Sequence, residues 1–236
     1  MSVFRCKQFS IKQTDSAMKI GTDSLILGCL AKAKKPQHIL DIGTGTGLLA
    51  LMMAQKFTEA KITAIDIDET AATEATYNAL QSKWVNRIVV SNLSLQDFML
   101  SNQQLFDLII TNPPYFVSNN HYPILPANRK LARQTIELPF EILLVNISKL
   151  LSVNGICWMV LPTGIAIDVI EKAQKYHLFN NHCIMVSPNE NKPFNRIIFS
   201  LSKQNTSVTT ATFYIYKSGG NEHTDTYKTT VADFLL

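Results

Sequence analysis

The residues with the clearest chemical potential in this 236-residue sequence are Asn112-Pro113-Pro114-Tyr115. They follow the mostly apolar stretch 106–110 after one residue, Thr111, so we expect them at the end of a buried strand. The side-chain oxygen of Asn112 and the backbone carbonyl of Pro113 can each accept one N–H of a planar amine. The prolines make this segment rigid, and the ring of Tyr115 offers a stacking surface. The pattern predicts chemistry on an exocyclic amino group.

A second pattern is a glycine-rich segment with G-x-G-x-G spacing, Asp41-Ile42-Gly43-Thr44-Gly45-Thr46-Gly47. Glycines at a strand-to-helix turn permit a tight backbone and let a ligand approach the free N–H groups of the helix start. Asp66 lies 19 residues after Gly47, at the end of the next predicted strand. A carboxylate in that position can accept both hydroxyl groups of a ribose. The two features together predict a nucleoside-binding site.

Asp41 indicates which of two nucleoside cofactors, S-adenosylmethionine or NAD, the site would bind. Its carboxylate would repel a pyrophosphate but could bind the ammonium group of a methionine moiety. The spacing also differs from the G-x-G-x-x-G of dinucleotide-binding proteins. We therefore expect S-adenosylmethionine rather than NAD. Its sulfonium makes a methyl group transferable, so no metal is expected.

Predicted strands and helices alternate along the chain, which indicates a mostly parallel sheet with helices on both faces. Strands are expected at 38–41, 61–66, 87–90, 106–110 and 156–161. The turn before the last of these is expected at Asn154-Gly155. Helices are expected at 48–57, 68–81 (with Asp68 as its N-cap) and 137–151. Residues 116–136 are interpreted as a long functional loop. Late strands at 182–186, 196–201 and 211–216 are expected to form an antiparallel edge.

This order predicts an α/β protein with a Rossmann-like fold, built as one domain over 1–236. Its expected parts are an amino-terminal segment, a core, and a carboxyl-terminal strand and tail, at 1–36, 37–203 and 204–236. Hydrophobic residues make up 46% and charged residues 17%, which excludes a disordered chain. The net charge of +4 suits a polyanionic partner without selecting one. With no signal peptide and no apolar run long enough to span a membrane, we expect a cytoplasmic protein.

With both motifs in place, the chain resembles amino-methyltransferases that carry D-x-G-x-G-x-G and N-P-P-Y. It is most similar to the bacterial tRNA1(Val) (adenine(37)-N6)-methyltransferase family. Residues 18–24, MKIGTDS, resemble that family's segment over the methionine end of the cofactor, and Ala132-Arg133 and residues 227–236 also look similar. The resemblance covers essentially the whole chain. It implies S-adenosylmethionine-dependent methylation of an adenine N6 in tRNA, at adenine 37 of a valine tRNA.

The resemblance also implies roles for individual residues. The cofactor is expected to contact Lys19, Thr22, Asp23, Asp41, Gly43, Gly45, Gly47 and Asp66. The target amine is expected at Asn112, Pro113, Pro114 and Tyr115. Such proteins often have an Asp after the third strand that contacts the cofactor adenine. Ser94 occupies that place here, so we expect the contact without a carboxylate.

Three basic residues follow the catalytic segment, namely Arg129, Lys130 and Arg133. They could bind RNA phosphates beside the active site, or they could form a solvated face of the loop.

Other functions remain compatible with the motifs. N-P-P-Y does not distinguish an aminopurine from an amide, so rRNA, DNA or a protein glutamine are alternative substrates. The chain lacks a helical amino-terminal domain of the kind found in release-factor methyltransferases, and it lacks an obvious DNA target-recognition domain. These are arguments from analogy between folds. A non-catalytic RNA-binding protein is a further alternative, against which the intact Asn112 and glycine turn argue.

Overall fold

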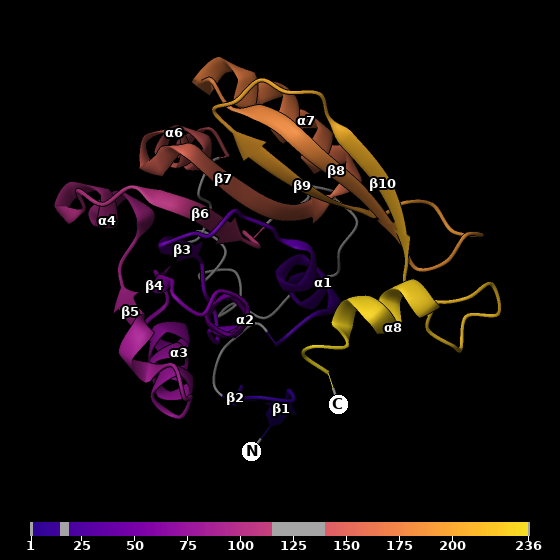
Figure 1. Cartoon of the computed structure of the whole chain (residues 1–236), viewed down its shortest axis with the longest axis horizontal. Coiled ribbons are helices and arrows are strands. Elements are labelled where there is room, and N and C mark those ends of the chain that lie inside the picture. Colours follow the sequence, from indigo (N-terminus) through magenta and orange to yellow (C-terminus); the bar gives the residue numbers. More distant parts are fainter. Residues whose placement is uncertain (1, 15–18, 115–139, 236) are drawn as a thin grey trace, which may run out of the picture.

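The computed structural model describes residues 2–14, 19–114 and 140–235. Its central feature is an eight-stranded sheet with the order β10-β8-β9-β7-β6-β3-β4-β5 (Figure 1). The strands are β3 (His38–Ile42), β4 (Lys61–Asp66), β5 (Ile88–Asn92), β6 (Phe106–Thr111), β7 (Leu151–Pro162), β8 (Phe179–Ser187), β9 (Arg196–Ser202) and β10 (Thr209–Tyr214). A separate antiparallel pair consists of β1 (Val3–Arg5) and β2 (Ser10–Lys12).

The strand order runs outward from β3 in two directions. β4 and then β5 lie on one side of β3, and β6, β7 and the later strands lie on the other. The five strands β5, β4, β3, β6 and β7 are all parallel to their neighbours. β9 is antiparallel to both β7 and β8, while the outermost strand, β10, runs parallel to β8. The predicted Rossmann-like α/β fold with late strands on an antiparallel flank is confirmed.

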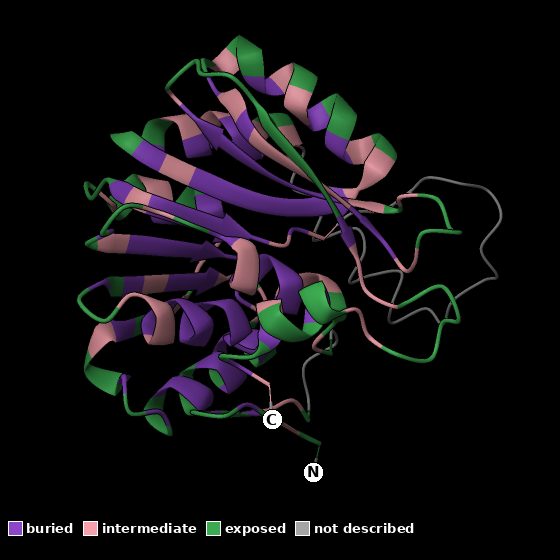
Figure 2. Ribbon diagram, turned by 45° about the vertical axis from the view of Figure 1, so that its right-hand side comes forward, coloured by how far each residue is buried: buried purple, intermediate pink, exposed green. Residues whose placement is uncertain are grey.

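The central strands β3 and β6 are buried on both faces because helices cover both sides of the sheet, whereas the outermost strand β10 is mostly exposed. In β3, the fully buried Ile39 packs into one hydrophobic core and its neighbour Leu40 into the other, since successive side chains of a strand point to opposite faces. Figure 1 shows α6 and α7 on one side of the sheet and α1, α2 and α8 on the other. Exposed positions gather on the outer faces of the helices (Figure 2).

The helices are α1 (Thr22–Leu30), α2 (Leu48–Lys56), α3 (Glu69–Leu80), α4 (Leu95–Ser101), α6 (Phe140–Leu150), α7 (Thr163–Ala173) and α8 (Asp225–Val231). Short 3₁₀ turns occur at Val85–Arg87 and Gln174–Tyr176. The predicted cap of α3 is confirmed, because Asp68 Oδ1 accepts a hydrogen bond from the N–H of Ala71 at 2.9 Å. The loop expected at 116–136 lies outside the described residues.

The turn predicted at Asn154-Gly155 is wrong, because β7 begins at Leu151 and runs through both residues. The pairing of β7 with β6 is irregular here, passing from Phe106 opposite Leu151 to Leu108 opposite Ile156. A Cβ on Gly155 would lie 2.6 Å from the carbonyl oxygen of Phe106. The glycine therefore permits a close approach of two strands at a bulge. Glycine is typical of both bulges and turns, so the local sequence does not distinguish the two.

Candidate active site

Three parallel strands, β3, β4 and β6, end side by side, and predicted site residues lie at these ends. Ile42 at the end of β3 lies opposite Thr111 of β6 and Ile65 of β4. Gly43, Asp66 and Asn112 are the next residues along the three strands, so they meet at one edge of the sheet. The Thr111 hydroxyl donates to the carbonyl of Ile42 at 2.8 Å, which ties the two central strand ends together. Ligands of open α/β sheets bind at this carboxyl edge.

The glycine turn is held together by Asp41. Its Oδ2 accepts from the Thr44 hydroxyl at 2.6 Å and from the N–H of Ala50 in α2 at 3.0 Å. Its Oδ1 is buried and has no hydrogen-bond partner within residues 2–14, 19–114 and 140–235. Burial of the fully enclosed carboxyl raises its pKa to about 7, although the two hydrogen bonds favour the ionised form. Asp41 thus organises the turn and retains one unused acceptor.

The three glycines of the turn all have left-handed backbones, with φ of 69° at Gly43, 56° at Gly45 and 86° at Gly47. Gly47 is also in close contact with α3, because a Cβ there would lie 3.3 Å from the Cα of Ala75. The positive φ and this contact together explain why the pattern requires glycine at its last position.

We expect Gly47→Ala to lower the free energy of unfolding by about 1–3 kcal/mol, from backbone strain plus contact with α3. Urea denaturation measures this change. Gly164→Ala is the matched control, because Gly164 lies in α7 with a negative φ and open space around it. The control is expected to leave stability unchanged or to raise it by up to about 1 kcal/mol. Equal stability of the two variants would contradict the assigned role of Gly47.

Asp66 lies directly beside the glycine turn. Its Oδ2 accepts from the N–H of Gly45 at 2.7 Å, and its Oδ1 accepts from the N–H of Asp68 at 2.9 Å. Burial raises the pKa of its carboxyl, opposed by these backbone hydrogen bonds. The carboxylate is partly buried and links the turn to the start of α3, where a ribose was predicted to bind.

Asn112 is half-buried at the end of β6, and its orientation is defined by one contact. Its side-chain Nδ2 donates to the hydroxyl of Ser24, in the first turn of α1, at 2.8 Å. Among the described residues, no donor is recorded for its Oδ1. Pro113 is buried and Pro114 half-buried behind it. The predicted stacking residue, Tyr115, lies outside the described residues.

The predicted cofactor residues of the amino-terminal segment have other partners. Asp23 Oδ2 forms an ion pair with Nε of Arg196, at the start of β9, at 2.7 Å. The Lys19 ammonium donates to the backbone carbonyls of Gln13 and Thr14. Thr22 is exposed at the start of α1. The contact of Ser24 with Asn112 places the first turn of α1 beside the end of β6. Cofactor contact by Lys19, Thr22 and Asp23 stays a prediction.

Ser94 follows β5 and caps α4. Its hydroxyl accepts from the N–H of Asp97 at 3.0 Å and donates to the carboxylate of the same residue at 2.6 Å. Ser94 therefore lies near the site, since the N–H of Leu93 donates to the carbonyl of Asp66 at 3.0 Å. Asp97 is exposed in the first turn of α4, and its carboxylate contacts Ser94, so a role for Ser94 at the cofactor adenine stays a prediction.

Two further residues contact site residues, Ser24 and Arg196. Ser24 lies in the segment 18–24 that resembles the family's cofactor-covering segment, but it was assigned no individual role from the sequence. Arg196 was given none, because its partner Asp23 lies far away in the chain. Thr44 did carry a local signal, because a hydroxyl three residues after an aspartate can bond to its carboxylate. The RNA-binding candidates Arg129, Lys130 and Arg133 lie outside the described residues.

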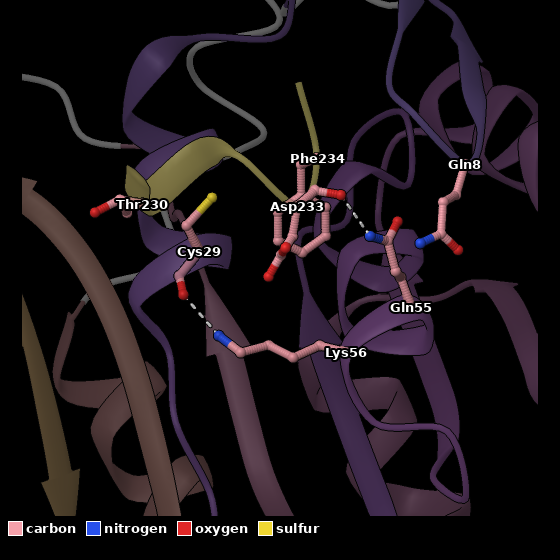
Figure 3. Close-up of a pocket in the computed structure, with 7 residues that line it drawn as sticks. All are labelled: Gln8, Cys29, Gln55, Lys56, Thr230, Asp233 and Phe234. Carbon is pink, nitrogen blue, oxygen red and sulfur yellow. Dashed lines mark hydrogen bonds between the residues drawn. The ribbon is translucent and has the colours of Figure 1, made fainter. Parts of the chain in front are cut away.

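Two cavities occur elsewhere in the described part of the molecule. One, of about 310 Å³, lies between α1, α2 and the carboxyl-terminal tail and is lined by Gln8, Cys29, Gln55, Lys56, Thr230, Asp233 and Phe234 (Figure 3). In it, Lys56 donates to the carbonyl of Cys29 at 2.6 Å and Gln55 to that of Asp233 at 2.8 Å. The other, of about 390 Å³, lies between β2 and α3. Neither includes a predicted site residue.

Within the described residues there is no cluster of three or more His, Cys, Asp or Glu side chains placed to hold a metal ion. A search of the same residues found no helix with the length and apolar character needed to cross a bilayer.

Residues 7–179 match the family model described as "Methyltransferase small domain". A tRNA1(Val) (adenine(37)-N6)-methyltransferase of Pedobacter heparinus is 39% identical over 236 residues, which cover all of this chain and 98% of the relative. The protein of the same name from Vibrio parahaemolyticus is 38% identical, over 99% of this chain and 95% of the relative.

Solved structures share the fold. A predicted O-methyltransferase from Agrobacterium tumefaciens superimposes with a TM-score of 0.68 at 16% identity, over 90% of this chain and 96% of that one. A methyltransferase from Pyrococcus furiosus gives a TM-score of 0.58 at 20% identity, over 83% and 89% of the two chains.

Proposed function

Because the chain belongs to the tRNA1(Val) (adenine(37)-N6)-methyltransferase family, we propose that it methylates the N6 amino group of an adenine in tRNA, adenine 37 of a valine tRNA, with S-adenosylmethionine as methyl donor. One observation carries the chemical part of the proposal. The side chain of Asn112 and the glycine turn lie at neighbouring strand ends, which supports a proposed amine acceptor beside a proposed nucleoside site.

The chain's own residues fit S-adenosylmethionine. The unpartnered Oδ1 of Asp41 is an acceptor suited to an ammonium group. The left-handed glycines leave the turn without side chains, and a Cβ on Gly43 or Gly45 would meet nothing within 4 Å. Asp66 supplies a carboxylate for ribose hydroxyls. When bound, the cofactor supplies a sulfonium-activated methyl group that needs no metal.

Asn112 and Pro113 prepare the amine. The lone pair of adenine N6 is delocalised into the ring, which makes the nitrogen a poor nucleophile. Acceptors for both N–H groups, the Oδ1 of Asn112 and the carbonyl of Pro113, hold the amine in a fixed direction and favour pyramidal geometry. Rigid prolines keep both acceptors in place, and Tyr115 is proposed to stack on the base.

The tRNA substrate is supported by the names of full-length relatives and by the chain's positive net charge. Arg129, Lys130 and Arg133 are the proposed phosphate contacts. The site is tested with a valine tRNA transcript and a second transcript in which adenine 37 is replaced by guanine. Methyl incorporation is expected only into the first. Equal incorporation into both would move the target to another adenine.

The stability of the protein should depend on pH because the carboxyl of Asp41 is buried. Because burial raises the pKa of this carboxyl to about 7, the folded protein retains a proton that the unfolded chain releases above about pH 4. The free energy of unfolding therefore falls as the pH rises from about 4 to 7. Asp41→Asn keeps an acceptor for Thr44 and Ala50 but cannot ionise.

We expect the free energy of unfolding of Asp41→Asn, relative to that of wild type, to rise by about 2 kcal/mol from about pH 5 to about pH 8. We also expect the variant's affinity for S-adenosylmethionine to fall. Urea denaturation at both pH values and calorimetry with the cofactor measure the two effects. A stability difference that does not change with pH would refute a buried carboxyl that titrates near neutrality. Unchanged affinity would remove Asp41 from the cofactor site.

A further inference from the structure

The contact between Asn112 and Ser24 joins the catalytic segment to a part of the chain that lies 88 residues earlier. Ser24 is in the first turn of α1, half-buried, and its Oγ accepts from Asn112 Nδ2 at 2.8 Å. Among the described residues, the Oγ of Ser24 has no second side-chain hydrogen-bond partner. The hydroxyl is thus positioned for one partner, the catalytic amide.

The first turn of α1 is itself held from both sides. Next to Ser24, Asp23 is ion-paired with Arg196 of β9 at 2.7 Å. Farther along the helix, Leu25, Ile26 and Leu27 are buried in the core that α1 shares with α2. The position of Ser24 is therefore set by rigid neighbours rather than by Asn112, as a fixed point of attachment requires.

The chemistry of an asparagine side chain gives this contact a consequence. Its oxygen and NH₂ ends have nearly the same shape but opposite hydrogen-bonding character. If the amide turned over, its N–H groups would face the N–H groups of the substrate amine, and no hydrogen bond could form. A serine hydroxyl can donate or accept, and in the observed bond it accepts from Nδ2, which leaves Oδ1 as the end available to the substrate.

From this geometry we infer that Ser24 is a positioning residue, which orients the Asn112 amide so that Oδ1 accepts from the target amine. The inference rests on the proposed function, because it assigns the orientation of that site's amine acceptor. Ser24 acts through Asn112 and has no contact of its own with the reacting atoms.

The test compares Ser24→Ala, which removes the acceptor, with Ser24→Thr, which keeps a hydroxyl. We expect Ser24→Ala to lower kcat for tRNA methylation by about 10-fold, with KM for tRNA and Kd for S-adenosylmethionine changed by less than about twofold. Ser24→Thr should recover most of the loss. Thermal melting and cofactor calorimetry establish that each variant is folded.

Thr206→Ala is the matched control. The hydroxyl of Thr206 accepts from the amide Nδ2 of Asn181 at 2.8 Å, the same type of bond and the same length. This bond lies near the start of β8, whereas Asn112 follows the carboxyl end of β6. The control variant is expected to keep wild-type kcat, so a loss in Ser24→Ala alone excludes a general effect of removing such a bond.

A spectroscopic measurement tests the orientation without turnover. The side-chain amide signals of Asn112 are identified by their absence in Asn112→Ala, and we expect their protons to exchange with water faster in Ser24→Ala than in wild type. Wild-type kcat and unchanged exchange in Ser24→Ala would overturn the inference while leaving the proposed function intact. Full activity of Asn112→Ala would instead overturn the proposed mechanism itself.

Discussion

Asn112→Ala is expected to lower kcat for methyl transfer by roughly 10³-fold while the affinity for S-adenosylmethionine changes by less than about twofold. The variant loses the side-chain oxygen that orients the amine, a contact made only with the reacting group. Asn112 contacts Ser24 of α1, whereas the glycine turn is organised by Asp41 and Asp66. The cofactor site should therefore keep its shape.

Single-turnover incorporation of labelled methyl groups measures the first quantity and calorimetry the second. Comparable loss of activity and cofactor affinity would make Asn112 a structural residue. The melting temperature is measured alongside, because the variant also loses its bond to Ser24. We expect it to change little, since α1 is held by the Asp23–Arg196 ion pair and by its buried side chains.

Asp66→Ala should mainly affect cofactor binding. We expect its Kd for S-adenosylmethionine to rise by about 10²-fold, because a carboxylate that accepts hydrogen bonds from two ribose hydroxyls contributes about 1.5–3 kcal/mol for each. Part of the loss reflects the turn, since the N–H of Gly45 and that of Asp68 lose their common acceptor. Asp66→Asn keeps an oxygen for Gly45 and is expected to show a smaller loss.

Asp68→Ala is the control for the second prediction. Asp68 lies two residues after Asp66 and caps α3, so its removal should lower stability by about 1 kcal/mol without a large change in cofactor affinity. If Asp66→Ala binds S-adenosylmethionine normally and Asp68→Ala does not, the ribose contact belongs to Asp68. Normal binding by both variants would place the ribose away from this turn.

The features that could be predicted from the sequence are those with local signals. Asp68 was recognisable as a helix cap because its side chain bonds within the same turn. The glycine turn and Asp66 were recognisable because each follows an apolar strand, and parallel strands bring their ends to one edge. Asn112 was placed by the same argument, and its register beside β3 agrees with it.

Other features depend on contacts between distant segments. The pairing of Asp23 with Arg196 spans 173 residues, and neither residue type indicates the other. The start of β7 was misplaced because Gly155 serves a bulge against β6, and an Asn-Gly pair more often marks a turn. Ser94 was recognised by its position after a strand, but its bond to Asp97 gives it a structural role in capping α4.

The most direct test of the proposed function is to incubate the protein with methyl-labelled S-adenosylmethionine and unmodified total tRNA, then to identify the labelled nucleoside by mass spectrometry. N6-methyladenosine is the predicted product, formed by wild type and lost in Asn112→Ala. Parallel incubations with rRNA, DNA and a protein fraction cover the alternative substrates. Label in any of these with none in tRNA, or a different methylated nucleoside in tRNA, would contradict the proposed function.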